Sequence, residues 1–212
     1  QQVVLGWVVF DMTGSSGMVG VVFATRSAPN LVVGLVAGSI TDRVDRRTLM
    51  RVAVWGMGLT ALTVGLLFSA GWLSIWQLMA LTFLLGTLQA FYMTARQVYA
   101  YDVVGARGAV NGIALISLGQ RLGQIFGSLL AGAVIQWQGT GETFLVMSLG
   151  YGLGGITLLA LRHAGASAPQ LREPMGENIL NYFRALRTNR LMLSLMISTA
   201  VAETFGFSHQ VM

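Results

Sequence analysis

The stretch that decides the fold is a charged segment between two long apolar runs, and it reads Gly38-Ser-Ile-Thr-Asp42-Arg43-Val-Asp45-Arg46-Arg47. Gly38 has no side chain, so a neighbouring helix can approach it closely. Asp42 follows the end of a predicted helix, where its carboxylate can pair with an arginine or cap another helix. The arginines, Arg43, Arg46 and Arg47, can hold the segment outside a membrane and bridge to facing helices. Contacts of this kind can form in one conformation and break in another, so we expect a conformational switch.

The rest of the sequence has very few charges. Of 212 residues, 54% are hydrophobic and 10% are charged, and the mean hydropathy is +0.67. Soluble domains contain about 25% charged residues. The composition therefore excludes a water-soluble globular enzyme and intrinsic disorder, and it predicts a polytopic membrane protein. Cysteine is absent, which excludes disulfides, thiolate metal sites and cysteine nucleophiles.

The positive charge is confined to particular segments of the chain. The net charge is +5 and every basic residue is an arginine. Arginines gather in 43–51, 96–107 and 162–190, whereas the predicted connections near 14–16, 69–74 and 137–141 have none. This alternation is the positive-inside pattern of membrane proteins. We therefore expect the arginine-rich connections to be cytoplasmic, and we interpret the charge as a topology signal rather than a nucleic-acid patch.

Apolar runs between these connections predict membrane-spanning helices. Strand alternation is weak and the runs are too long for barrel strands, which favours an all-α fold. No charged residue occurs in 52–95, which is long enough for two spans, with a turn at 69–72 and Trp72 and Trp76 as interfacial anchors. The expected elements are the outer half of a helix in 1–13, a span in 16–40, two spans in 52–95, a cytoplasmic connection in 99–108, and spans in 110–136 and 144–161.

The composition changes after the sixth span. We expect an N-terminal helical bundle in 1–161, a polar cytoplasmic linker in 162–190, and the start of a seventh span in 191–212. Apolar residues at helical spacing in 179–186 predict an amphipathic helix in the linker, lying either on the membrane surface or on protein. Both termini fall within apolar runs, so we expect a fragment of a longer chain, truncated at both ends. Six helices, a linker and further helices is the layout of transporters built from two halves.

The segment from Gly38 to Arg47 resembles the G-x-x-x-D-R-x-G-R-R/K signature between the second and third helices of the major facilitator superfamily, with Asp45 at the position of the second glycine. The ends of the first and fourth helices and the start of the fifth, in 7–16, 94–104 and 111–117, are similar to bacterial multidrug, macrolide and enterobactin exporters of this superfamily. The resemblance implies the six-helix N-terminal half of a 12-helix fold. It also implies that the loop acts as a lock on the conformational change.

A second pattern lies in the fifth predicted span. Small residues recur at Gly119, Gly123, Gly127 and Gly132, which makes a flat face for helix packing or a place where a helix can bend. The pattern resembles the antiporter signature G-x-x-x-G-P-x-x-G-G, with Ser128 in place of the proline and Ala131 in place of a glycine. The resemblance implies export by proton exchange, and a generic packing face remains the alternative.

A few polar residues within the spans are candidate site residues. Charges near the bilayer centre are costly, by about 3 kcal/mol or more, so they usually face a cavity. Arg26 and Arg121 could form a positive cavity wall or serve structure alone, and Glu203 could carry protons because burial raises the pKa of a carboxylate. Gln120 and Gln124 flank Arg121. The sequence contains no metal-ligand spacing and no catalytic set, so we expect neither a cofactor nor a metal.

These patterns together predict a secondary transporter in the bacterial inner membrane. We expect proton-coupled efflux of drugs or siderophore-like small molecules by alternating access, from a protein that is monomeric when complete. An importer or lipid transporter of the same fold is one alternative. A non-transporting membrane scaffold or sensor is another. The measured direction of transport distinguishes an exporter from an importer. Failure of the complete protein to move any substrate would favour the scaffold or sensor.

Overall fold

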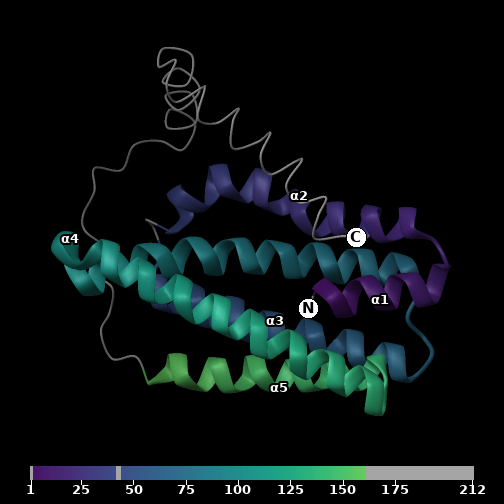
Figure 1. Ribbon diagram of the computed structural model, residues 1–212. Coiled ribbons are helices and arrows are strands. Elements are labelled where there is room, and N and C mark those ends of the chain that lie inside the picture. Colours follow the sequence, from purple (N-terminus) through teal and green to yellow (C-terminus); the bar gives the residue numbers. More distant parts are fainter. Residues whose placement is uncertain (1, 42–43, 161–212) are drawn as a thin grey trace. The chain divides into compact units, whose positions relative to one another are not determined.

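A computed structural model describes residues 2–41 and 44–160, and every regular element in these residues is an α-helix (Figure 1). The helices are α1 (Gln2–Thr13), α2 (Ser16–Thr41), α3 (Arg46–Ser69), α4 (Ile75–Gln138) and α5 (Thr140–Leu159). They belong to a compact unit, Gln1–Pro169, and the second unit of the chain, Gln170–Met212, lies outside the described residues. The predicted linker, amphipathic helix and seventh span therefore lie outside the described residues, and the all-α prediction is confirmed.

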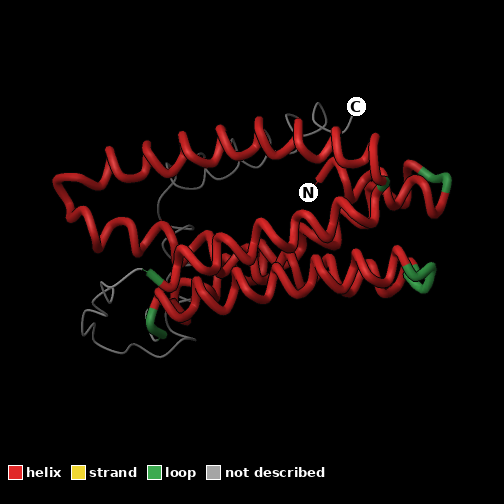
Figure 2. The backbone as a smooth tube through the Cα atoms, turned by 90° about the horizontal axis from the view of Figure 1, so that it is seen from below, coloured by secondary structure: helices red, strands yellow, loops and turns green. Residues whose placement is uncertain are grey.

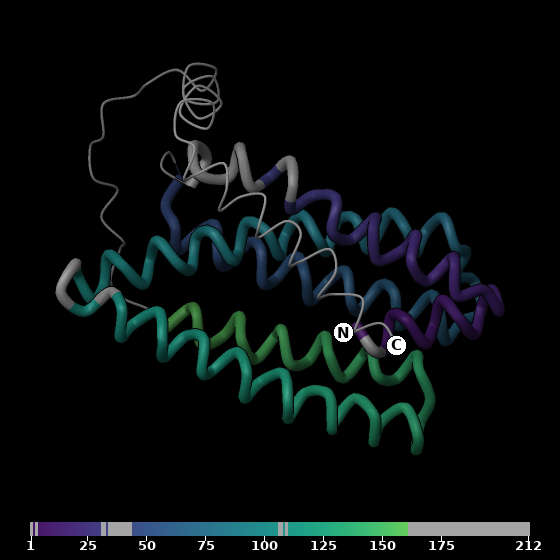
Figure 3. The backbone as a smooth tube through the Cα atoms, turned by 45° about the horizontal axis from the view of Figure 1, so that its top comes forward, coloured from purple at the N-terminus to yellow at the C-terminus, as the bar shows by residue number. Residues whose placement is uncertain are grey.

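Helix α4 consists of two helices that meet at Gly105. This residue has φ 68° and ψ 173°, a conformation that glycine adopts without the strain of a side chain. The chain reverses there, so the segment Val110–Gln138 runs back along the segment Ile75–Gly105 (Figures 2 and 3). The predicted connection over 99–108 contains this turn but is too long, because the helix continues to Gly105 and the turn needs only the glycine.

Four described helices are long and apolar enough to cross a membrane, namely Arg46–Ser69, Ile75–Gly105, Val110–Gln138 and Thr140–Leu159. The predicted turn after Ser69 is confirmed, and Ser74 begins α4 with a capping box in which its side chain and that of Gln77 bond reciprocally to backbone N–H groups. The predicted connection over 137–141 contains the turn but is too long, because Trp137 and Gln138 are helical and Gly139 alone makes the turn at φ 98°. The sixth span accordingly begins at Thr140 rather than 144.

The helices pack in pairs through small residues. Helix α3 lies along α5, α2 lies along α4, and α3 also contacts α4. A Cβ atom at Gly65 of α3 would lie 2.9 Å from Cδ2 of Leu145 of α5, so the two backbones are close because the residue is glycine. The main cluster of buried side chains joins α1, α2, α3, α4 and α5 through Val4, Val22, Val64, Leu78 and Phe144.

The connections sort to two opposite ends of the helices. At one end lie the start of α3, the turn at Gly105 and the end of α5, and side-chain contacts of Arg46 and Arg51 join these segments. At the other end the turn at Gly139 lies near Ser69, whose Oγ would be 2.5 Å from a Cβ at Gly141. The described arginine-rich connections therefore share one end and the arginine-free connections share the other. Which end faces the cytoplasm stays a prediction.

Candidate functional site at the arginine-rich end of the helices

An ion pair joins the start of α3 to α4. Arg46 is the first residue of α3 and is 7% exposed, and its Nη1 donates to Oδ2 of Asp102 on α4. The Asp102 side chain is 20% exposed, so the pair is largely shielded from solvent. The sequence motif indicates Arg46 but not Asp102, although Asp102 is the one acid between Asp45 and Glu142. The sequence signal that could have indicated Asp102 is its position three residues before Gly105, where the helix reverses.

Asp45 fixes the position of Arg46 by capping α3. Its Oδ2 accepts hydrogen bonds from the backbone N–H of Thr48 at 3.1 Å and from the Thr48 hydroxyl at 2.7 Å. The pKa of Asp45 lies below its ordinary value, first because of the Thr48 hydroxyl hydrogen bond and further because of backbone N–H groups and the charge of Arg47, against a smaller effect of burial. The aspartate at the signature's glycine position therefore acts as the N-cap of the next helix.

Arg51 holds the end of α5 against α3. Its Nε and Nη2 donate to the carbonyl oxygen of Leu158, each at 3.1 Å, and Nη2 also donates to that of Leu159 at 3.0 Å. The last carbonyl groups of a helix have no partner within the helix, and a cation is favourable at that end. One guanidinium from α3 therefore satisfies the last two carbonyl groups of α5. The sequence indicates Arg51 only as part of the charged cluster.

The other residues of the predicted switch loop are only partly described. Gly38 lies in the last turns of α2, and Arg47 is a half-buried residue of the first turn of α3. Asp42 and Arg43 lie outside the described residues. Among the described residues of the predicted loop, Arg46 makes a side-chain contact with another helix, the ion pair with Asp102.

Arg26 lies buried where α2 crosses α4. It is 8% exposed, and its Nη2 donates to Oε1 of Gln89 on α4 at 2.6 Å. A Cβ atom at Gly86 would collide with the Arg26 carbonyl oxygen, so the backbones of the two helices touch at this crossing. Pro29, one turn later, is also buried inside α2 and leaves the helix without one backbone N–H donor.

The segment Val110–Gln138 exposes the remaining predicted site residues. Arg121 and Gln124 are exposed, and Gln120 is half-buried with its Nε2 3.6 Å from Sδ of Met93. No atom beyond the helix's own lies within 4 Å of a Cβ built at Gly119, Gly123, Gly127 or Gly132 in the described residues. The structure does not bring Arg121 to Arg26, and Glu203 lies outside the described residues.

The sequence matches the Major Facilitator Superfamily over residues 2–210. The chain belongs to this superfamily of membrane transporters. The helices described above fit part of its helical fold, and the predicted family, the all-α polytopic class and the prediction that the chain is not an enzyme are confirmed. Within residues 2–41 and 44–160, no three His, Asp or Glu side chains gather into a possible metal site.

Several curated proteins are similar to the chain. Multidrug resistance protein MdtG of Yersinia enterocolitica is 27% identical over 87% of this chain and 42% of its own length. The Staphyloferrin A transporter of Staphylococcus aureus is 23% identical over 98% of the chain and 52% of its own length. The putative glycerol-3-phosphate transporter 2 of Arabidopsis thaliana is 28% identical over 68% of the chain and 30% of its own length. The chain thus spans about half the length of these relatives or less, and no solved structure matches it.

Proposed function

We propose that the chain is part of a bacterial inner-membrane transporter that exports drugs or siderophore-like small molecules in exchange for protons. The observation that carries the proposal is the superfamily match over residues 2–210. The relatives named for multidrug resistance and for Staphyloferrin A support the two substrate classes. The described arginine-rich connections share one end of the helices, which supports an orientation with that end in the cytoplasm.

The Arg46–Asp102 pair is the proposed lock of the transport cycle. Taking one partner from a largely buried ion pair leaves an unbalanced charge, which costs about 3–5 kcal/mol in a protein interior. Both helices belong to one predicted bundle, 1–161, so rocking of two bundles does not separate α3 from α4. The pair is therefore proposed to hold the loop before α3 in the position from which Asp42, Arg43 and Arg47 lock the closed conformation against the other bundle.

The substrate or proton cavity is proposed to lie between the halves of the complete transporter. Arg26, Arg121, Gln120, Gln124 and Glu203 are the candidate residues for it. Its expected movement is alternating access by rocking of two helical bundles about a midplane site. The glycines at 119, 123, 127 and 132 are proposed to pack or bend during that movement, as in the antiporter signature.

The test is efflux from cells that express the complete gene product. We expect cells to accumulate less ethidium or less of a carboxylate-bearing fluorescein dye than vector controls, and a protonophore to abolish the difference. Asp102→Asn, Arg46→Gln and Asp42→Ala should each reduce efflux by at least tenfold at unchanged membrane abundance, because each weakens the lock. Asp11→Asn is the matched control, since Asp11 is exposed and lies at the other end of the helices.

Four results would each contradict a part of the proposal. Wild-type efflux by Asp102→Asn and Arg46→Gln would remove the ion pair from the transport cycle. Unchanged substrate affinity and rate in Arg121→Ala would remove that residue from the cavity. Uptake instead of efflux in vesicles with an imposed proton gradient would identify an importer, and no movement of any tested solute would favour a scaffold or sensor.

A further inference from the structure

Arg96 lies inside α4 with a charge that its described neighbours do not neutralise. Its Cζ stands 5.4 Å from the centre of the Tyr92 ring, and its Nη2 donates to Sδ of Met93 at 3.3 Å. A thioether is a weak hydrogen-bond acceptor, and a ring face offers only a partial negative charge. Within residues 2–41 and 44–160 no carboxylate lies at ion-pair distance from Arg96, and its buried Nε has no hydrogen-bond partner there.

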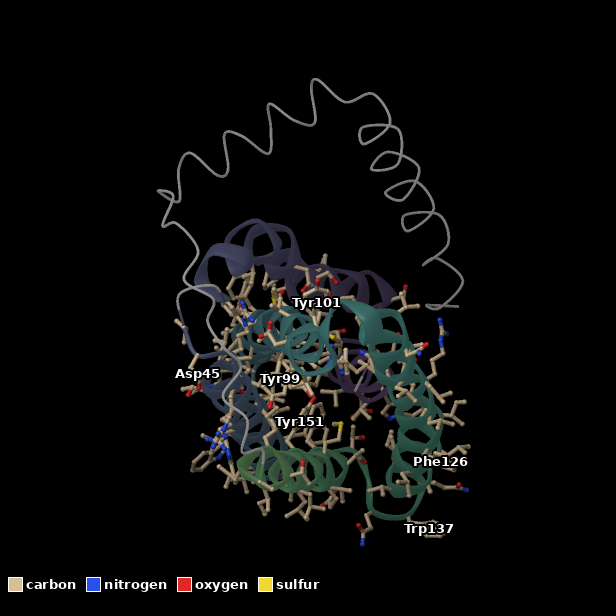
Figure 4. All side chains as sticks on the ribbon, turned by 90° about the vertical axis from the view of Figure 1, so that its left-hand side faces the viewer. Asp45, Tyr99, Tyr101, Phe126, Trp137 and Tyr151 are labelled. Atoms are coloured by element: carbon tan, nitrogen blue, oxygen red, sulfur yellow. The ribbon has the colours of Figure 1, made fainter. Side chains whose placement is uncertain are left out.

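The location of Arg96 differs from that expected of a surface arginine. The sequence alone places it beside a cytoplasmic connection, but the helix continues for about 13 Å beyond it to Gly105. It lies about one turn before Tyr99, which Figure 4 labels between the helices. A guanidinium is always charged, so a half-buried one at this depth calls for an anion.

A second donor points to the same place. Gln120, on the returning segment Val110–Gln138, directs its Nε2 to the same Sδ atom of Met93 at 3.6 Å. Two strong donors from two helices therefore share one weak acceptor. The amide and the guanidinium would both form stronger hydrogen bonds if a charged oxygen took the place of the sulfur.

A further cation, Arg26 of α2, contacts the same face of α4. Gln89 precedes Arg96 by about two helical turns and therefore lies on the same face, and it accepts the hydrogen bond from the buried Arg26 described above. Two arginines, Arg26 of α2 and Arg96, thus lie along this face of α4.

We infer that Arg96 and Gln120 bind an anionic oxygen group, a carboxylate or a phosphate, of a solute that enters between the two segments of α4. Tyr92 forms the wall of the site, and the flexible Met93 side chain moves aside when the solute arrives. The inference rests on the proposed transport function and narrows its substrate class to anionic small molecules.

The binding test uses the purified complete gene product in nanodiscs of neutral phosphatidylcholine. The probes are citrate and inorganic phosphate, compared with sodium chloride at equal ionic strength, and the readout is the midpoint of thermal unfolding. We expect at least one of the two probes to raise the midpoint of the wild-type protein. Arg96→Gln should require at least tenfold more of that probe for half of the shift, and Gln120→Ala should show a smaller loss.

Control variants separate a binding role from a structural one. Gln97→Ala changes an exposed neighbour on the same helix and should leave the shift intact. Arg96→Lys keeps the charge but not the planar fork, and it should retain part of the shift. An equal shift in the wild-type protein and Arg96→Gln would overturn the inference, as would no shift with either probe.

Two further arms distinguish a solute from a lipid, and binding from transport. Stabilisation that appears only in nanodiscs containing phosphatidylglycerol, and that needs Arg96, would assign the site to a lipid phosphate and overturn the solute. Efflux by Arg96→Gln cells should fall at least tenfold for the fluorescein dye and less for cationic ethidium. If no dye is exported but citrate binding depends on Arg96, the transport proposal fails and the anion site stands.

Discussion

Two regions of the molecule contain glycines within long apolar helices, but their surroundings differ. In α3, α5 and the segment Ile75–Gly105, the space beside Gly65, Gly86 and Gly155 is occupied by atoms of a neighbouring helix. In the segment Val110–Gln138 the space beside Gly119, Gly123 and Gly127 is open within the described residues. Phe126 and Trp137 of this segment point away from the other helices (Figure 4). A stripe of small residues therefore predicts that a neighbouring helix can pack closely, but it does not predict whether such a helix is present.

The charged side chains follow the same division. In the packed region Arg46 pairs with Asp102, Arg51 holds the end of α5, and Arg26 donates to Gln89. On the returning segment Arg121 is exposed. The packed helices thus use their arginines to join one another, whereas the returning segment leaves Arg121 exposed. The comparison between the two regions can be tested by matched substitutions.

The largest effect is expected for Gly86→Ala. The added methyl group would collide with the backbone carbonyl of Arg26, which cannot rotate away as a side chain could. Overpacking of this kind costs about 3 kcal/mol, at the upper end of its usual range. The measurement is the unfolding midpoint of the complete gene product in detergent. Gly123→Ala is the control and should change stability by less than about 0.5 kcal/mol, and equal losses would show that both regions are equally packed.

A smaller loss is expected for Arg51→Met. The substitution keeps the apolar stem but removes the hydrogen bonds to the carbonyl groups of Leu158 and Leu159. Because Arg51 is partly exposed, we expect a loss of about 1–2 kcal/mol in the free energy of unfolding. Arg121→Met is the matched change on the returning segment and should have little effect. A loss for Arg121→Met as large as that for Arg51→Met would mean that Arg121 also joins helices.

The smallest effect is expected at the start of α3. Asp45→Ala removes the N-cap and should cost about 1 kcal/mol, as such caps usually do, whereas Asp11→Ala should cost less because no capping bond is lost. Since the pKa of Asp45 is lowered in the folded protein, its contribution is present above the ordinary aspartate pKa and is lost as pH falls through the lower folded value. Asp45→Asn retains a capping side chain and should lose that part of the pH dependence. If Asp45→Asn loses stability on acidification in the same way as the wild-type protein, this role of Asp45 is contradicted.

Much of the helix plan follows from periodicity and composition alone. The four described spans from Arg46 onward, the turn at 69–74 and the break near 105 were predictable, because an apolar run long enough to cross a bilayer has few alternatives to a helix. The predicted connections at 99–108 and 137–141 are too long. Single glycines with positive φ close both turns, and the predicted polar boundary residues continue the helices instead.

The candidate site was predictable only in part. Arg46 is identified by its place in a motif, but its partner Asp102 is far away in the sequence and carries no motif of its own. The sequence places Arg96 beside a loop. Its distance from that loop depends on where the segment Ile75–Gly105 ends, which the sequence does not show. Arg51 gives no sign that it reaches the carbonyl groups of α5, since backbone acceptors cannot be recognised in a sequence.

By itself the sequence determined the class of protein, the family and the segregation of the arginines. These depend on hydropathy and local spacing, which are properties of single segments. Only the tertiary structure decided which helix each glycine and each arginine meets. That choice depends on how helices cross, and close packing and ion pairing act between atoms that folding alone brings together.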